Sequence, residues 1–134
     1  MEFNITTEKL PDTTELLELF SQTKWANNRS VEDVRALLKN TNTYVVIRDE
    51  EKLIGFGRAI TDGIYRALLD DIVIDKNYRN KGLGGQIIDK LMDRLKNIEE
   101  VFLNTGEHLE KFYQKFGFKK ATCLTMTVKI KCNT

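Results

Sequence analysis

The sequence contains few of the residues that define several protein classes. Its 134 residues include one histidine, one proline and two cysteines, and no cysteine lies in a CxxC pair. The usual zinc-ligand spacings cannot be built from this set, so we expect no metal site. The cysteines, Cys123 and Cys132, lie close to the C-terminus. We interpret both as reduced thiols of an intracellular protein.

Long apolar runs and an excess of one charge are also missing. No stretch approaches the ~20 apolar residues of a membrane helix, which argues against a membrane protein. The first residues are acidic and lack the apolar centre of a signal peptide, so we expect a cytoplasmic location. Lys and Arg number 21 and Asp and Glu number 20, for a formal charge of +1. This balance argues against nucleic acid as the main partner.

What remains is the composition of a globular protein, with 41% hydrophobic and 31% charged residues. The chain shows no internal repeat, no low-complexity stretch and no long linker. We therefore expect a single domain that spans residues 1–134.

Hydrophobic periodicity predicts the order βααβββαβαβ. The first four strands suit antiparallel pairing, whereas the segment 67–103 predicts a right-handed parallel crossover. Helices are expected to begin at Asp12, with Glu15 as its capping partner, and at Ser30. Two more helices are expected from Gln86 and over 109–116. The expected strands are 3–5, 44–47, 53–60, 67–74, 101–103 and 124–130.

The segment 72–85 is the most informative part of the sequence. It predicts a strand, a basic loop with Lys76, Arg79 and Lys81, a glycine turn and the start of a helix. Glycines let a ligand approach the main chain, and the free N–H groups at a helix start favour an anion. The pattern indicates a phosphate or pyrophosphate site, although a tight turn with solvated lysines is the simpler alternative.

Two common phosphate motifs are excluded at this turn. A Walker A loop needs GxxxxGK[ST], which the chain lacks. A dinucleotide fingerprint starting at Gly82 would need a third glycine where Ile87 stands. The ligand is therefore a phosphate compound of another kind.

Two motifs resemble the GNAT superfamily of acyl-CoA-dependent N-acetyltransferases. The run 79–84, Arg-Asn-Lys-Gly-Leu-Gly, matches the superfamily's (Arg/Gln)-x-x-Gly-x-(Gly/Ala) signature. The run 112–118, Phe-Tyr-Gln-Lys-Phe-Gly-Phe, is similar to its Phe-Tyr-x-x-x-Gly-Phe element. The resemblance covers about residues 43–118. It implies an α/β (α+β) fold with a mixed, mostly antiparallel sheet, helices on both faces, one βαβ crossover and splayed parallel strands.

The resemblance also implies that acetyl-CoA is the co-substrate. Its pyrophosphate would contact main-chain N–H groups of 80–85, and its pantetheine arm would run beside 72–74. The residues implied in binding are Ile72, Val73, Ile74, Arg79, Asn80, Lys81, Gly82, Leu83, Gly84, Gly85 and Asn104.

Acetyl transfer to an amine needs a proton donor for the departing thiolate and a proton acceptor for the amine. The resemblance assigns the donor role to Tyr113, whose phenol is protonated at neutral pH; the alternative is a core aromatic. Asp71 is our expected base. Strand alternation predicts that Asp70 and Asp71 lie on opposite faces, and the alternative is an ion pair with Arg58 or Arg66.

The acceptor is expected to be a small-molecule or peptide amine. We expect the acetyl group to pass to it directly in a ternary complex. Its contacts are predicted to come from Trp25, Phe56, Arg58 and Asp70, although Trp25 has core packing as an alternative. A catalytically idle acyl-CoA-binding module that acts as a sensor or interaction partner is the second hypothesis. A phosphate-binding protein unrelated to CoA is the third, and the C-terminal strand is a candidate interface for a homodimer.

Overall fold

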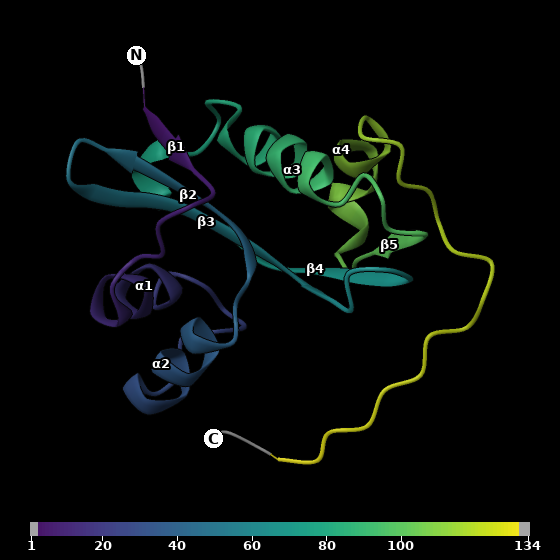
Figure 1. Cartoon of the computed structure of the whole chain (residues 1–134), viewed down its shortest axis with the longest axis horizontal. Helices are drawn as coiled ribbons and strands as arrows, with labels where there is room; N and C mark the ends of the chain where they lie inside the picture. The colour runs from purple at the N-terminus through teal and green to yellow at the C-terminus, as the bar shows by residue number, and fades with distance from the viewer. Residues whose placement is uncertain (1–2, 132–134) are drawn as a thin grey trace. The chain divides into compact units, whose positions relative to one another are not determined.

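The computed structural model describes residues 3–131 (Figure 1). The chain forms two compact units, one ending at Leu103 and the other beginning at Asn104. The first unit holds a five-stranded sheet and three helices, and the second holds one short helix and the C-terminal segment. The expectation of one domain over 1–134 stays a prediction.

The sheet of the first unit is mixed, as the sequence predicts. Its strands lie in the order β1-β2-β3-β4-β5. The first four pair antiparallel, and β4 and β5 pair parallel across the α3 crossover. The bounds are β1 Asn4–Thr6, β2 Thr43–Asp49, β3 Lys52–Thr61, β4 Arg66–Ile74 and β5 Glu100–Phe102.

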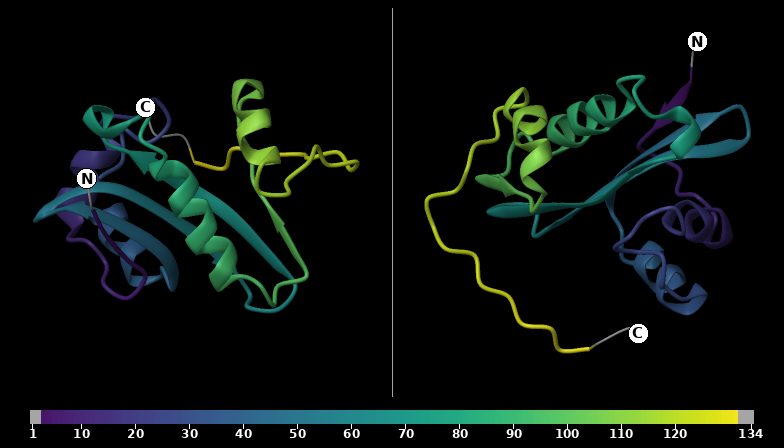
Figure 2. Two further views of the ribbon diagram at one scale, coloured as in Figure 1. Left: turned by 90° about the horizontal axis from the view of Figure 1, so that it is seen from above. Right: turned by 180° about the vertical axis from the view of Figure 1, so that it is seen from behind.

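Helices cover both faces of this sheet, which confirms the predicted fold class. In Figures 1 and 2, α1 (Thr13–Phe20) and α2 (Val31–Lys39) lie on one face, and α3 (Leu83–Arg94) lies on the other. The start of α1 is held by Glu15, whose carboxylate accepts from the Asp12 N–H at 2.8 Å. Ser30 accepts from the Asp33 N–H at 3.1 Å and starts α2. None of the helices between residues 3 and 131 is long and apolar enough to cross a membrane.

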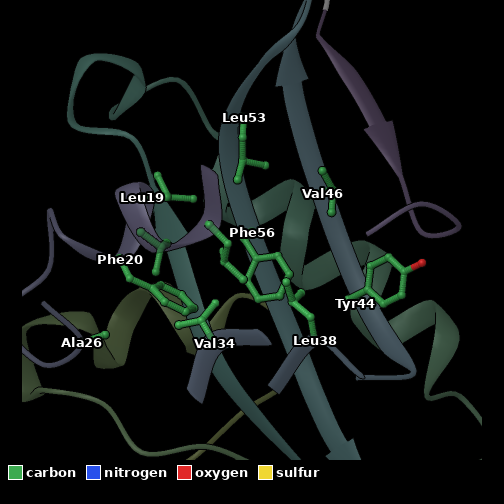
Figure 3. Packing of buried hydrophobic residues seen from close by; sticks show 11 residues of the cluster. Leu19, Phe20, Ala26, Val34, Leu38, Tyr44, Val46, Leu53 and Phe56 are labelled. Atoms are coloured by element: carbon green, nitrogen blue, oxygen red, sulfur yellow. The ribbon is translucent and has the colours of Figure 1, made fainter. Parts of the chain in front are cut away.

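Each face of the sheet has its own apolar core. Under α1 and α2, the rings of Phe20 and Phe56 meet edge to face with centroids 6.2 Å apart (Figure 3). On the other face, α3 buries Ile87, Ile88 and Leu91 completely. A Cβ at Gly57 of β3 would come within 2.5 Å of the Ile87 side chain, so only glycine allows this close approach.

β4 is interrupted by a bulge in the middle of the strand. Arg58 of β3 pairs with Asp70 and Phe56 pairs with Val73, so β4 carries one residue more than β3 between these pairs. Asp71 adopts a left-handed conformation there, with φ 55°. Beyond the bulge β4 continues to Ile74, whereas its last partner pair with β5 is Leu68 with Phe102. The two parallel strands therefore part, as the predicted splay requires.

The C-terminal strand expected over 124–130 is wrong. In the second unit, α4 (Glu110–Gln114) follows a 3-10 turn (Glu107–Leu109), and residues 119–131 form neither helix nor strand. The alternating residues Leu124, Met126, Val128 and Ile130 are each at least 78% exposed. Alternation makes a strand only where a partner strand supplies hydrogen bonds and an apolar surface. Cys123 is an exposed free thiol, and Cys132 lies outside the described residues.

Candidate functional site

The loop after β4 is held by a polar network that starts at Asp75. The Asp75 N–H donates to the Ile54 carbonyl at 2.7 Å, and its buried carboxylate accepts from the Asn77 N–H at 2.8 Å. Gln22, in the segment after α1, donates to the same carboxylate at 3.1 Å and accepts from the Lys76 N–H at 2.8 Å. These bonds fix the end of β4 and start the 3-10 turn (Lys76–Tyr78) that leads to the glycines.

The turn that follows exposes its backbone. Asn80 and Gly82 have left-handed φ values of 64° and 80°, and nothing lies within 4 Å of the position that a Cβ on Gly82 would take. Gly82 is the N-cap of α3, and its carbonyl accepts from the Gln86 N–H at 3.2 Å. Gln86 is the first residue whose N–H donates a hydrogen bond within α3. The N–H groups of residues 83–85, just before it, have no acceptor in the helix and are free to bind an anion.

The cationic side chains of the loop differ in their contacts with the rest of the chain. Arg79 Nε donates to the Ile74 carbonyl at 3.2 Å, so this side chain folds back on the end of β4. Lys76 and Lys81 are exposed. The loop thus presents positive charge beside the free N–H groups, which fits the predicted pyrophosphate.

The end of β4 leaves one side of its backbone without a partner strand. Ile72 and Ile74 are half-buried and Val73 is buried. Because β5 has ended at Phe102, β4 has no partner from β5 along this stretch. Backbone groups on that side of the strand can therefore pair with an extended ligand.

Asp71 is clamped by two arginines. Its side chain has no exposed surface, and its Oδ2 lies 2.8 Å from Arg58 Nε and 3.0 Å from Arg29 Nη1. The Arg29 guanidinium also lies 4.7 Å from the centre of the Phe20 ring. Asp71 Oδ1 has no hydrogen-bond partner among the described residues. This pairing connects β4 to the segment between α1 and α2.

Asp70 has a different environment. Its side chain is 41% exposed, one oxygen accepts from the Asp71 N–H at 2.9 Å, and the other lies 3.5 Å from Arg58 Nη2. Both aspartates thus approach the same guanidinium, and their predicted placement on opposite faces is wrong because the bulge breaks the alternation. Partial burial and the neighbouring Asp71 carboxylate raise the pKa of Asp70 above its ordinary value.

The other predicted acceptor residues are dispersed. Trp25 is 63% exposed in the segment between α1 and α2, which argues against its alternative as a packed core residue. Phe56 has no exposed surface and belongs to the core. Arg58 lies two residues after Phe56 on β3 and contacts both aspartates.

The second unit carries the predicted proton donor. The Tyr113 ring meets Phe112 and Phe118 edge to face, with centroids 5.0 and 6.0 Å apart. Burial raises the pKa of the Tyr113 hydroxyl above its ordinary value of 10.0, so the phenol is protonated at neutral pH. Asn104 is exposed at the start of this unit.

Sequence reasoning missed two residues that shape the site. Arg29 and Gln22 lie in the segment between α1 and α2, far from β4 in the sequence, and no motif marks them. Each binds a single carboxylate, Asp71 for Arg29 and Asp75 for Gln22, and the sequence offers many other cationic and amide side chains that could do so. The partner is known only once the packing of α1 on the sheet is known.

Among the described residues, no group of three or more His, Cys, Asp or Glu side chains is placed to hold a metal ion.

Comparison with known proteins identifies the family. A GNAT acetyltransferase domain model matches residues 40–120, more than half of the chain. An uncharacterized N-acetyltransferase, ycf52, from Pyropia yezoensis is 30% identical over 112 residues, and a GCN5-related N-acetyltransferase of Arabidopsis thaliana, named as chloroplastic, is 34% identical over 74 residues. These matches cover 79% and 54% of this chain, but only 64% and 29% of the relatives.

A crystal structure gives the same result for the fold. A probable acetyltransferase of unknown function from methicillin-resistant Staphylococcus aureus superposes with a TM-score of 0.85 at 25% identity, over 98% of this chain and 100% of that one. The chain belongs to the GNAT acetyltransferase family.

Proposed function

We propose that this chain is an N-acetyltransferase that moves an acetyl group from acetyl-CoA to a primary amine in a ternary complex. The observation that carries the proposal is the start of α3, where the free N–H groups of 83–85 follow two left-handed residues, Asn80 and Gly82. Family membership supports the same ligand.

The residues present fit acetyl-CoA in two places. The turn with Gly82 has open space where a side chain would stand, beside free N–H groups and exposed lysines. The 72–74 stretch of β4, where β5 has ended, suits an extended arm. We retain Ile72, Val73, Ile74 and the 79–85 loop as the proposed contacts. Acetyl-CoA would supply the acetyl group as an activated thioester.

Within this chain, we assign the amine's proton acceptor to Asp70 in preference to Asp71. Asp71 is completely buried and both arginines bind its Oδ2, whereas Asp70 is part-exposed and has a raised pKa. Asp70 would take a proton from the bound ammonium and leave a neutral amine, which can attack. Asp71 would position Arg58 and Arg29.

Tyr113 would then protonate the departing thiolate. Overall, an N–C bond forms, the C–S bond breaks, and the ammonium nitrogen loses two protons. One passes to solvent through Asp70, and the second, lost from nitrogen after the attack, replaces the proton that Tyr113 gives to the thiolate. A phenol whose pKa is raised by burial holds its proton until a strong base forms nearby.

The CoA site is tested by two matched glycine substitutions. Gly82 and Gly63 have nearly the same φ, 80° and 81°, and both have open space at the Cβ position. Alanine at either position strains the backbone by a similar amount, about 1 kcal/mol. We expect Gly82→Ala to weaken acetyl-CoA binding at least ~10-fold by calorimetry, which corresponds to about 1.4 kcal/mol, and Gly63→Ala to leave it unchanged. Equal affinities for wild type and both variants would contradict the site.

Turnover is tested at Tyr113. We expect Tyr113→Phe to reduce the rate of CoA release about 10²-fold with acetyl-CoA binding intact, the usual size of a general-acid contribution. The matched control is Tyr65→Phe at an exposed turn residue. CoA binding without release by any amine would favour the idle acyl-CoA-binding module. A chain that acetyl-CoA does not protect against thermal unfolding would favour a phosphate-binding protein of another kind.

Two further parts of the proposal rest on the sequence. We propose a cytoplasmic location, which fractionation of cells expressing the natural protein would test. We also propose self-association through the exposed apolar residues of the C-terminal segment.

A further inference from the structure

We infer that the acceptor is an amine with an apolar body, whose ammonium binds Asp70 and whose carbon chain lies on an exposed apolar row of the sheet. The inference rests on the proposed function and narrows its substrate class. It depends on the register of β3, β4 and β5 and on the exposure of the residues that the register brings together.

The apolar row consists of Ile60, Leu68 and Phe102. Ile60 pairs with Leu68 across β3 and β4, and Leu68 pairs with Phe102 across β4 and β5. Paired residues share a face of the sheet, so three large side chains from three strands stand side by side. Ile60 is 50% exposed and Phe102 46% exposed, and Leu68 between them is part-exposed.

Asp70 belongs to the next row on the same face. It pairs with Arg58, and each of them lies two residues along its strand from a member of the apolar row, Leu68 and Ile60 respectively. Residues two apart on a strand lie on one face, about 7 Å from each other. A carboxylate therefore borders the apolar row at the distance of a short carbon chain.

No helix of the first unit covers this part of the face. Figures 1 and 2 show α1 and α2 beneath the part of the sheet nearer β1, while the end where β4 and β5 pair extends beyond them. Phe56 and Val73, on the same face beyond Asp70, lie in the core under those helices. The row is thus the uncovered continuation of a buried surface.

The charges around the row favour Asp70 as the partner of the ammonium. Asp71 is neutralised by two arginines, and the Asp62 carboxylate accepts from the N–H groups of Ile64, Tyr65 and Arg66 in its own turn. Asp70 combines partial exposure with a single, 3.5 Å ion-pair contact. At the other end of the row, the exposed Glu100 lies 3.5 Å from its strand partner Arg66. Asp70 is the part-exposed acid that stands next to the 72–74 stretch proposed for acetyl-CoA, so it is the one that a reacting amine would reach.

The test is a series of amines assayed by CoA release. For unbranched amines from ethylamine to hexylamine, we expect kcat/KM to rise about fourfold for each added methylene, the ratio expected when one CH₂ leaves water. Adding hexylamine should also shift the methyl NMR signals of Ile60 and Leu68.

A matched pair of variants localises the effect. Ile60→Ser should flatten the chain-length dependence. Ile64→Ser, at a residue that is 60% exposed in the adjoining turn but outside the row, should preserve it. Thermal unfolding of both variants checks that they fold.

The outcomes separate this inference from the proposed function. Acetylation of short amines without chain-length dependence, or equal flattening in both variants, would overturn the inference alone. A dimer that Ile60→Ser dissociates, without any shift on adding hexylamine, would assign the row to a second copy and overturn it as well. No CoA release with any amine would overturn both.

Discussion

Asp70 and Asp71 are adjacent in the sequence, but we expect the charged Asp71 to stabilise the fold and the charged Asp70 to destabilise it. Asp71 is a buried carboxylate that two guanidinium groups neutralise, whereas Asp70 is desolvated and repelled by its neighbour more than Arg58 stabilises it. The two side chains carry the same charge, so charge alone does not define their roles. Their roles differ because Asp71 contacts two arginines and Asp70 contacts one.

Substitution of each aspartate by asparagine should show this difference. Asp71→Asn leaves Arg29 and Arg58 without their shared partner, and we expect it to lower the free energy of unfolding by about 3 kcal/mol. Asp70→Asn should be neutral or slightly stabilising at neutral pH. Urea unfolding of both variants measures the two effects, and equal losses would contradict this account.

The raised pKa of Asp70 also gives a pH dependence with a defined sign. The folded protein holds the proton of this group at a higher pH than the unfolded chain, whose pKa is near 3.8. Wild-type stability should therefore fall, relative to Asp70→Asn, as the pH rises through the interval between these two pKa values. Measuring both unfolding free energies from about pH 3 to pH 7 tests the sign. A difference that is independent of pH would show that Asp70 titrates normally.

At the scale of the elements, α1 is tied to the sheet by Glu15. Its carboxylate closes the helix start at Asp12 and also pairs with Arg48 of β2, with Arg48 Nη1 3.0 Å from Glu15 Oε2. The hydrogen bond from Arg48, reinforced by the Asp12 N–H, lowers the pKa of Glu15 in spite of its partial burial. One side chain thus fixes both where the helix begins and where it packs.

Glu15→Gln should show the opposite pH dependence to Asp70→Asn. A lowered folded pKa means that the stabilisation is present above the ordinary value of 4.5 and is lost as the pH falls through the folded value. We expect the variant to lose about 1 kcal/mol at pH 7, a small value because the pair is partly exposed, and progressively less as the pH falls below 4.5. Thermal unfolding across this range checks it. Glu18→Gln, a glutamate of the same helix without an ion pair in the described structure, is the control.

For the molecule as a whole, the exposed C-terminal segment is the feature that bears on assembly. Leu124, Met126 and Val128 alternate with polar residues and have no partner strand in the described chain. Such a segment favours pairing with another strand.

Self-association is expected to depend on one side of this segment. We expect Val128→Glu to shift the protein towards monomer in sedimentation velocity, whereas Thr127→Glu, which adds the same charge to the alternate side, should have a smaller effect. A wild-type protein that is monomeric at all concentrations would contradict the proposed association.

Much of the fold could be predicted from the sequence, because local patterns carry it. The β2–β3 hairpin and the glycine turn before α3 follow from alternation, periodicity and a few turn residues. The prediction of a strand over 124–130 was wrong, since periodicity does not report whether a partner strand is present. The bulge at Asp71 and the Arg29 contact could not be predicted, because both depend on tertiary packing that no local pattern encodes.

The extra residue in β4 also determines how this strand responds to insertions and deletions. Removing residue 71 would restore uninterrupted alternation with Ile72 opposite Gly57, so that Val73 would still face the core beside Phe56 and Ile72 and Ile74 would keep their present face. Removing residue 69, in the regular part of the strand, would instead turn one end of β4 over relative to the other. In a library of deletion variants, loss of residue 71 should therefore preserve the register of β4, whereas loss of residue 69 should not.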